Sequence, residues 1–438
     1  MKYIKDAERQ GFELALRCFT SPRALFEDEL QAIMKIALVH YAYPPVIGGV
    51  EFVMEQQAAL FARRGHTVRV IAGRAESTVD GVSVNEIPEL LPAHPRNEQS
   101  QAEIAGNGPT PAYEELKAEL KGRLEEVLAD CQVVFVHNMM TMHFNLAATA
   151  ALAELAAEGV LGGRFVNWVH DIAAIDENYD LGELLGSEPW SLLAGAPQCF
   201  KHAAISKKRQ QEYCELTGID AGQCPVVPNG VRYIRLLKLT DPVRKLCRQH
   251  GVLYQDIVML QPTRILRRKN IEFGIRVLAE LKRAGHKVVY LVTGAPDAHN
   301  PAARDYGREL RELAGELGVD NEFHFLSETF EISDEDLVSI YNASDLLFLP
   351  SRQEGFGLPL LEAGVFRIPA FCARVEPMCS ILENNVNLFD LVEEPAEVAR
   401  RVAVTLGDDP GYRARKEVIK NYSWERLFDE RIKPLFLG

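Results

Sequence analysis

Short apolar runs alternate with segments of helical periodicity along this chain, and the alternation restricts its fold more than any other feature. Residues 34–40 and 67–72 are apolar runs of strand length, and apolar side chains recur at helical spacing over residues 50–64 between them. Strands that alternate with helices are typical of a parallel sheet covered by helices on both faces. The sequence therefore predicts an α/β fold.

The second half of the chain repeats this pattern and begins near residue 233. The strands expected there are residues 257–261, 287–293, 321–325 and 346–349. A turn signal, Val-Val-Pro-Asn-Gly-Val, occupies residues 226–231 and is the expected hinge between the halves. In the first half, the polar stretch at 92–111 contains proline and glycine and is expected to be a long loop.

We expect two Rossmann-like, doubly wound domains, residues 34–232 and 233–423, that face each other across a cleft. Ligands of such sheets bind at the carboxyl ends of the strands, so the cleft is the expected active site. Residues 1–33 are expected to be a helical extension, with helical patterns at 7–16 and 25–33 and no recognisable site.

Composition excludes several function classes. The formal net charge of −14 argues against nucleic acid or an anionic membrane as the main partner. No apolar stretch has the ~18 to 20 residues of a membrane span, and no signal peptide is recognisable. The eight cysteines are scattered without CxxC pairs, which indicates neither a zinc site nor a disulfide framework. We therefore expect a cytoplasmic enzyme.

Two carboxylates and a glycine turn stand directly after the apolar run that ends at residue 350. The segment Ser-Arg-Gln-Glu-Gly-Phe-Gly-Leu-Pro-Leu-Leu-Glu-Ala places Glu354 and Glu362 eight positions apart. A helix is expected to start near Leu358 or Pro359. Its free N–H groups and positive dipole end would then point to where Glu354 lies, which suits a phosphate or a polyhydroxylated ligand.

Four cationic residues follow the expected strand at 257–261. They are Arg264, Arg267, Arg268 and Lys269, within six positions of one another. At the carboxyl edge of a strand, such a cluster forms an electrostatic seat for a diphosphate. The alternative is that these residues only cover a loop.

The first half offers further strand-end candidates. Gly48 and Gly49 follow the first strand and open a helix, which allows close approach of a phosphate or only a tight connection. His170 ends the strand that begins at residue 165, and His137 ends an earlier strand. Each can bind a ligand or be a structural histidine. A Gly-x-Gly-x-x-Gly fingerprint is missing, which counts against a dinucleotide-dependent oxidoreductase.

The Glu354-x7-Glu362 segment resembles the signature of the retaining family-4 (group 1) glycosyltransferases of the GT-B fold. The resemblance implies that Glu354 meets the transferred sugar, that Glu362 holds the ribose of the nucleotide, and that Arg264 and Lys269 neutralise the donor diphosphate. It also implies sugar contacts from His170 and from the N–H groups around Phe356, Gly357 and Leu358, and a place for Gly48 and Gly49 on the opposing wall. The residues that it makes catalytic are Glu354, His170, Lys269 and Arg264.

The resemblance covers about residues 34–434. Tyr422-Ser-Trp-Glu425 is similar to the start of the family's final helix, which implies that residues 424–438 cross back to the N-terminal domain. The segment 374–388 lacks the glycines that are usual after the second glutamate. This departure leaves the transferred sugar open. Ser206 is expected to cap a helix.

These observations lead to one main hypothesis. The chain is expected to be a retaining glycosyltransferase that moves a hexosyl group from a UDP- or GDP-sugar to an acceptor hydroxyl, with no metal ion and no cofactor. The alternatives are a catalytically silent subunit that binds sugar nucleotides, and a GT-B epimerase or phosphorylase. Acceptor contacts are expected from the loops at 92–111 and 171–190. The sequence identifies neither the acceptor nor the oligomeric state.

Overall fold

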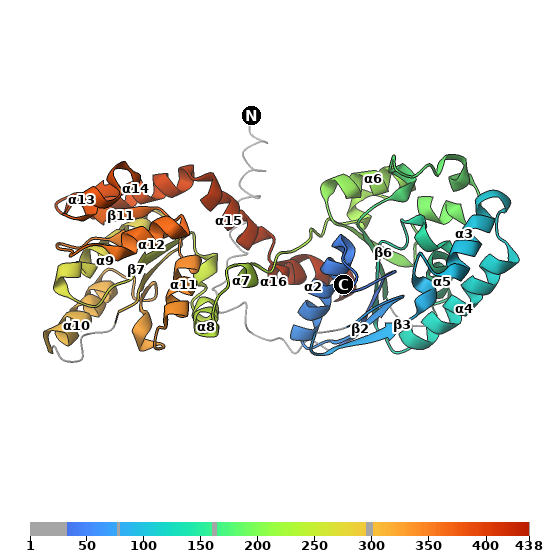
Figure 1. Ribbon diagram of the computed structural model, residues 1–438, viewed down its shortest axis with the longest axis horizontal. Coiled ribbons are helices and arrows are strands. Elements are labelled where there is room, and N and C mark those ends of the chain that lie inside the picture. The colour runs from blue at the N-terminus through green and yellow to red at the C-terminus, as the bar shows by residue number, and fades with distance from the viewer. Residues whose placement is uncertain (1–32, 77–78, 160–163, 295–300, 438) are drawn as a thin grey trace, which may run out of the picture. The chain divides into compact units, whose positions relative to one another are not determined.

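The computed structural model describes residues 33–76, 79–159, 164–294 and 301–437 (Figure 1). Except for residue 33, the helices expected at 7–16 and 25–33 lie outside these residues. The described chain forms two compact units. The C-terminal unit is Arg232–Asn421, and the N-terminal unit is the chain up to Val231 together with Tyr422 and the residues after it.

The N-terminal unit contains a six-stranded sheet in which all neighbouring strands are parallel. The order is β3-β2-β1-β4-β5-β6. In chain order, the strands are β1 Lys35–Val39, β2 Thr67–Ala72, β3 Val82–Glu86, β4 Val133–His137, β5 Arg164–Val169 and β6 Phe200–Ala204. The central strands β1 and β4 are almost wholly buried because they are apolar on both faces.

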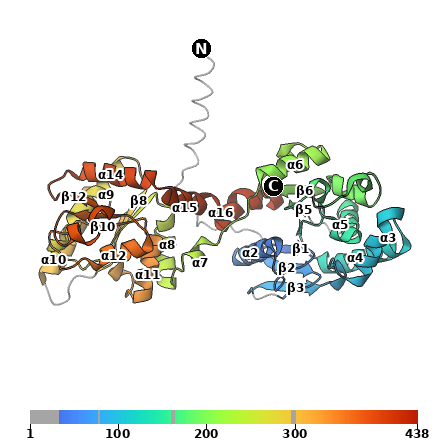
Figure 2. The same cartoon turned by 45° about the horizontal axis from the view of Figure 1, so that its top comes forward.

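Helices cover both faces of this sheet, as Figures 1 and 2 show. The longer ones are α2 Gly49–Arg63, α3 Pro95–Asn107, α4 Pro111–Leu128, α5 Leu146–Glu158 and α6 Lys207–Thr217. On one face, α4 contributes a row of buried leucines that pack with α5 against the sheet. On the other, Met54 and Phe61 of α2 belong to a second buried cluster.

The prediction of a long loop at residues 92–111 was wrong, because most of this stretch forms the helix α3. Asn97, Ser100 and Ile104 are the side chains that α3 buries almost completely, at the spacing of a helix face. The Asn97 amide donates to the carbonyls of Pro92 and Phe144, at 2.9 and 2.8 Å. Two of the three buried positions are polar, so the helix lacks the apolar period by which an amphipathic helix is recognised.

The end of the chain packs into the core of the N-terminal unit, as the resemblance implied. It consists of α16 (Trp424–Leu427), a π-helical turn (Phe428–Ile432) and α17 (Lys433–Leu437). Its buried aromatic rings lie close to Phe61 of α2. Arg64, just after α2, binds the Asp429 carboxylate at 2.8 Å.

The C-terminal unit has a second six-stranded parallel sheet, in the order β12-β11-β10-β7-β8-β9. Its strands are β7 Ile257–Gln261, β8 Val288–Val292, β9 Phe323–Phe325, β10 Leu346–Leu349, β11 Ala370–Ala373 and β12 Asn387–Phe389. Its longer helices are α8 Asp241–Gln249, α9 Ile271–Arg283, α10 Pro301–Glu316, α11 Asp334–Ala343, α12 Leu358–Phe366, α14 Pro395–Asp408 and α15 Pro410–Asn421. Buried clusters again lie on both faces of the sheet.

A buried ion pair fixes α15 to the amino-terminal edge of this second sheet. The Lys416 ammonium lies 2.5 Å from the Asp345 carboxylate, and both side chains are at most 9% exposed. Asp345 also accepts from the Val258 N–H at 2.8 Å, and Lys416 donates to the Gln255 carbonyl at 3.1 Å. Each buried charge therefore has both an opposite charge and a hydrogen bond.

In each sheet, the direction in which successive strands are added reverses once. The first three strands of each sheet extend to one side, and the fourth pairs with the other edge of the first strand. The reversal lies between β1 and β4 in the N-terminal unit and between β7 and β10 in the C-terminal unit. The predicted class of two doubly wound α/β sheets is confirmed. In such sheets, the crevice at the carboxyl ends of the strands beside the reversal is the usual ligand site.

Candidate functional site

Two loops meet at the strand reversal of the C-terminal unit. One follows β7 and the other follows β10. Asn270 ends the first loop and donates to the Pro350 carbonyl in the second at 2.9 Å, while the Arg352 N–H donates to the Arg268 carbonyl at 2.8 Å. A Cβ added to Gly294, just beyond β8, would lie 2.0 Å from the Thr263 carbonyl oxygen. Close packing therefore fixes the base of the loop after β7.

The expected partners Lys269 and Glu354 are in direct contact there. The Lys269 ammonium donates to both carboxylate oxygens of Glu354, at 2.7 and 2.8 Å, and the two side chains are 14% and 9% exposed. The Arg268 guanidinium lies 3.8 Å from the same carboxylate and also donates to the Gln353 carbonyl. The structure thus joins the cationic cluster and the first glutamate at one point.

The other cations of the cluster point to different surroundings. Arg264 is exposed on the same loop, next to Gly294. Arg267 pairs with Glu309 of α10 at 2.6 Å and lies over the Tyr306 ring. Arg264 therefore remains available to a ligand, whereas Arg267 is bound to the neighbouring helix.

Helix α12 begins at Leu358, as predicted. Gly357 precedes it with φ +94°, a conformation that favours glycine, and no side chain caps the helix start. The Leu358 N–H is therefore open to an acceptor, whereas Pro359 has no N–H and the Leu360 N–H donates to the Gly357 carbonyl at 2.9 Å. Phe356 and Leu358 are more than half exposed beside this end.

Glu362 lies one turn into α12 and is held by a second helix. The Tyr341 hydroxyl, from α11, donates to Glu362 Oε2 at 2.6 Å. Tyr341 is buried, and its ring stacks on Phe366 with centroids 4.8 Å apart and planes 1° apart. One carboxylate oxygen of Glu362 is thus fixed, which orients the other.

The strand reversal of the N-terminal unit carries three histidines. His40 follows β1, His137 ends β4 and His170 follows β5. His40 Nδ1 lies 2.7 Å from the His137 carbonyl oxygen, and His137 Nδ1 lies 3.1 Å from His170 Nε2. All three are at most 5% exposed. Sequence reasoning had found His170, left His137 open and missed His40.

Burial keeps these imidazoles neutral. It lowers the pKa of His40 to about 4 and that of His170 to about 3, from the ordinary value of 6.5. It also lowers the pKa of His137 well below the ordinary value, and the neighbouring His170 and His40 lower it further. Neutral imidazoles can donate through one ring nitrogen and accept through the other.

The backbone around His170 is fixed from two sides. The Asn138 side-chain oxygen accepts from the N–H groups of His170 and Asp171, at 3.2 and 2.8 Å. Arg209 of α6 donates to the His170 carbonyl at 2.9 Å and binds the Asp171 carboxylate at 3.2 Å. Ser206 caps α6 by accepting from the Arg209 N–H, as expected.

The two expected glycines flank the start of α2. A Cβ at Gly48 would collide with the Glu51 carboxylate, whereas nothing lies within 4 Å of one at Gly49. Glu51 Oε1 is also 3.9 Å from His40 Nε2. A carboxylate therefore occupies the space over Gly48, and the space over Gly49 is open.

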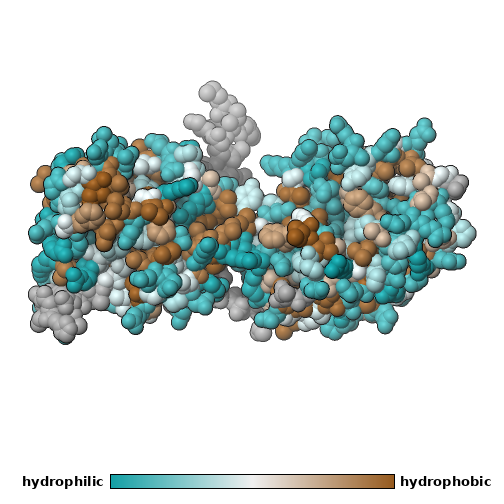
Figure 3. All heavy atoms as spheres, viewed as in Figure 1, coloured by the Kyte–Doolittle hydropathy of each residue, from teal (hydrophilic) through white to brown (hydrophobic). Residues whose placement is uncertain are grey.

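No helix of the described residues is both long and apolar enough to span a membrane, and no group of three or more of their His, Cys, Asp or Glu side chains is arranged to hold a metal ion. Figure 3 shows hydrophobic residues exposed among hydrophilic ones on the side of the molecule seen in Figure 1.

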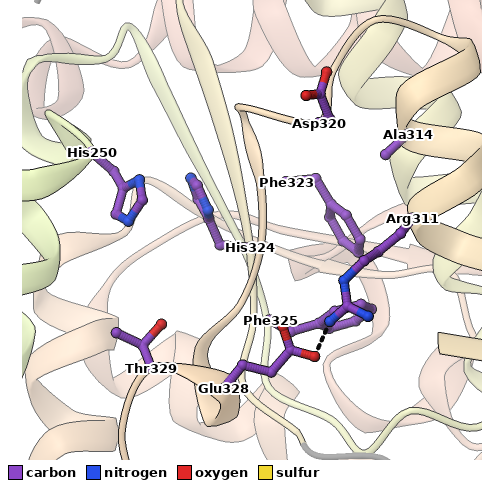
Figure 4. A pocket seen from close by; sticks show the side chains of 9 residues that line it. All are labelled: His250, Arg311, Ala314, Asp320, Phe323, His324, Phe325, Glu328 and Thr329. Carbon is purple, nitrogen blue, oxygen red and sulfur yellow. Dashed lines mark hydrogen bonds and ion pairs between the residues drawn. The ribbon is translucent and has the colours of Figure 1, made fainter. Parts of the chain in front are cut away.

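A separate cavity of about 220 Å³ lies at the edge strand β9 of the C-terminal unit (Figure 4). His250 and His324 line it with ring centroids 4.1 Å apart, and Arg311 and Glu328 form an ion pair in its wall. None of the residues expected to form the site lines this cavity.

Two doubly wound units in one chain, one with cations and carboxylates at its strand reversal, define a two-domain α/β enzyme of the GT-B type. Residues 47–233 match the family described as Glycosyltransferase Family 4, and residues 244–422 match Glycosyl transferases group 1. The chain belongs to the group 1 glycosyltransferases, and it is a transferase that uses a nucleotide sugar.

Relatives extend over most of the chain. An uncharacterised glycosyltransferase of Methanocaldococcus jannaschii is 25% identical, over 91% of this chain and 97% of its own length. Mannosylglucosylglycerate synthase of Thermotoga maritima is 27% identical, over 75% of this chain and 78% of its own. Among solved structures, a glycosyltransferase from Rickettsia africae is 16% identical, with 92% of this chain and 98% of that chain covered and a TM-score of 0.36.

Proposed function

We propose that the chain is a retaining glycosyltransferase that moves a hexosyl group from a UDP- or GDP-sugar to an acceptor hydroxyl without a metal ion. The observation that carries the proposal is the contact of Lys269 with both oxygens of Glu354 at the strand reversal of the C-terminal unit. A cation, an acid and an open helix start at one strand end suit a donor that joins a diphosphate to a polyol.

Each residue of this crevice has a proposed task. Lys269 and Arg264 bind the diphosphate, and the N–H groups at Gly357 and Leu358 add their dipoles. When the diphosphate attracts Lys269, oxygens of Glu354 become free to accept from sugar hydroxyls. Glu362 accepts from the ribose hydroxyls through the oxygen that Tyr341 leaves free.

The N-terminal unit supplies the remaining groups in this proposal. His170 hydrogen-bonds a hydroxyl of the donor sugar near the reacting carbon, and the open backbone at Gly49 admits a phosphate oxygen, with Gly48 beside it. The acceptor binds on the side of this unit.

The proposed step breaks the bond between the anomeric carbon and the diphosphate oxygen, and the acceptor oxygen bonds to the same face of that carbon. The acceptor proton passes to the departing phosphate oxygen. Lys269 and Arg264 stabilise the negative charge that develops on that leaving group, which is the task a divalent cation performs in other transferases. No covalent nucleophile takes part.

A panel of UDP- and GDP-sugars tests this proposal through the nucleotide released, with EDTA present and with candidate acceptors. We expect one nucleotide sugar to be turned over, with retained anomeric configuration. Lys269→Ala and Glu354→Gln are expected to lose nearly all of this activity with folding unchanged. Arg267→Ala is the matched control, because it removes a cation of the same loop that binds α10 instead.

The outcomes separate the alternatives. Full activity in both Lys269→Ala and Glu354→Gln would overturn the site assignment. Calorimetry that detects UDP or GDP binding in a protein without turnover would identify a silent binding subunit. Loss of activity in EDTA, with recovery on adding a divalent cation, would refute the metal-independent step.

A further inference from the structure

We propose that His137 is a positioning residue that fixes the tautomer of His170, so that His170 carries its proton on Nδ1. The catalytic consequence rests on the proposed function, because it assumes that His170 meets the donor sugar. The tautomer itself does not, since it follows from contacts within the N-terminal unit.

The His137 ring is held firmly. It ends β4 opposite Trp168 in β5, and the two rings stack with centroids 5.6 Å apart and planes 28° apart. The His137 carbonyl oxygen lies 2.7 Å from His40 Nδ1. A carbonyl only accepts, so His40 carries a proton on Nδ1 and donates it. This contact fixes His40 as the Nδ1–H tautomer.

The next contact leaves two arrangements. His137 Nδ1 and His170 Nε2 are 3.1 Å apart, and a hydrogen bond between neutral rings requires a proton on one nitrogen and a lone pair on the other. Either His137 donates through Nδ1, or His170 donates through Nε2. The choice depends on the remaining nitrogen of His137.

That nitrogen, His137 Nε2, is buried and has no hydrogen-bond partner among the described residues. If His170 donated, the single proton of neutral His137 would lie on this orphan nitrogen. Buried N–H groups without an acceptor are rarer than buried acceptors without a donor. The geometry therefore favours donation by His137 Nδ1 to His170 Nε2, which places the His170 proton on Nδ1.

Fixing this proton has a consequence for chemistry. A fixed Nδ1–H gives His170 one defined donor for a sugar hydroxyl or for developing negative charge, whereas an unrestrained ring divides its population between two tautomers. Asn138 and Arg209 already hold the His170 backbone. His137 therefore acts on the protonation pattern of the ring and not on the position of the chain.

Nitrogen NMR of the full-length protein labelled at histidine tests the tautomer at neutral pH, with His170 assigned from its loss in His170→Gln. We expect the Nδ1–H form of His170 in the unaltered protein. His137→Phe keeps the stacked ring but removes the donor, so His170 should shift toward the Nε2–H form. His137→Asn returns an N–H near the Nδ1 position and should restore the Nδ1–H form.

Steady-state kinetics of the same variants tests the catalytic consequence. His137→Phe is expected to lower kcat for the donor about tenfold with KM within about twofold, and His137→Asn to recover most of the loss. His202→Phe is the control, since it removes another buried histidine of the same sheet that bonds Tyr213 instead. An Nε2–H form of His170 in the unaltered protein, or an unchanged His170 spectrum in His137→Phe, would overturn the inference. If no nucleotide sugar is turned over, the proposed function fails while the tautomer result still stands.

Discussion

The two sheets share one strand order but present different chemistry where that order reverses. The N-terminal unit places three neutral imidazoles there, and the C-terminal unit places a lysine bound to a carboxylate. The shared topology explains why both units have side chains at this point. The residue types at the strand ends explain the difference, since charged groups suit a diphosphate and neutral hydrogen-bonding groups suit hydroxyls.

The cost of burial also differs between the two reversals. Lys269 and Glu354 are paired with each other, with 2.7 Å between the ammonium and the carboxylate. His40 has only the Glu51 carboxylate, 3.9 Å from its Nε2, and no acid among the described residues pairs with His170, so burial keeps both imidazoles neutral. The neutral state of the three histidines is lost when protons are added, because burial lowers the pKa of each of them.

Acid should therefore destabilise the N-terminal unit first, which is the largest effect we expect. The folded pKa of His40 is about 4 and that of His170 about 3, both below the unfolded value of 6.5. Between these values the unfolded chain binds more protons, so stability is full above pH 6.5 and falls as the pH decreases. At pH 5 each histidine is expected to remove roughly 2 kcal/mol.

Hydrogen exchange at pH 7.5 and pH 5 measures this difference in the whole protein. Amides of β1, β4 and β5 should lose more protection at pH 5 than those of β7 and β10. The C-terminal unit has a smaller set of this kind, His250 and His324, whose pKa values are also lowered by burial. If the amides of both sheets lost equal protection at pH 5, the predicted difference in acid sensitivity between the two units would be wrong.

Lys416→Ala should destabilise the C-terminal unit by about 3 kcal/mol, because it leaves the Asp345 carboxylate buried without its cation. Chemical denaturation with exchange readout on β7 and β10 measures the effect. Lys420→Ala is the matched control on the same helix, since its partner Asp256 and the lysine itself are about one-third exposed. A loss of protection confined to the N-terminal sheet would contradict this prediction.

The fold was predictable from the sequence, because buried strands and amphipathic helices each give a recognisable spacing of apolar residues. The contact of Lys269 with Glu354 was also within reach, because both residues follow strands whose carboxyl ends share one edge. Helix α3 was not predictable in this way, because the polar residues Asn97 and Ser100 occupy its buried face. The contacts among His40, His137 and His170 were not predictable either, because His40 and His137 are 97 residues apart in the sequence and the strand order is needed to bring them together.

Nucleotide binding should separate the two reversals directly. Lys269→Ala is expected to weaken UDP or GDP binding about a hundredfold, because a charge-assisted contact with the diphosphate is lost. His170→Gln should change the same affinity by less than about twofold, since the imidazole is proposed to meet only the sugar. Calorimetry with the nucleotide alone measures both. Similar losses in the two variants would show that the chemical division between the units is wrong.

Tyr341→Phe is expected to have the smallest effect and to sharpen the picture of the C-terminal crevice. The variant keeps the ring that stacks on Phe366 but removes the hydrogen bond to Glu362. A hydrogen bond to a charged group contributes roughly 1.5 kcal/mol, so nucleotide affinity should fall about tenfold. Comparison of a nucleoside diphosphate with inorganic pyrophosphate locates the loss. If Glu362 holds the ribose, only the nucleotide should bind more weakly, and an equal loss for pyrophosphate would place Glu362 at the phosphates instead.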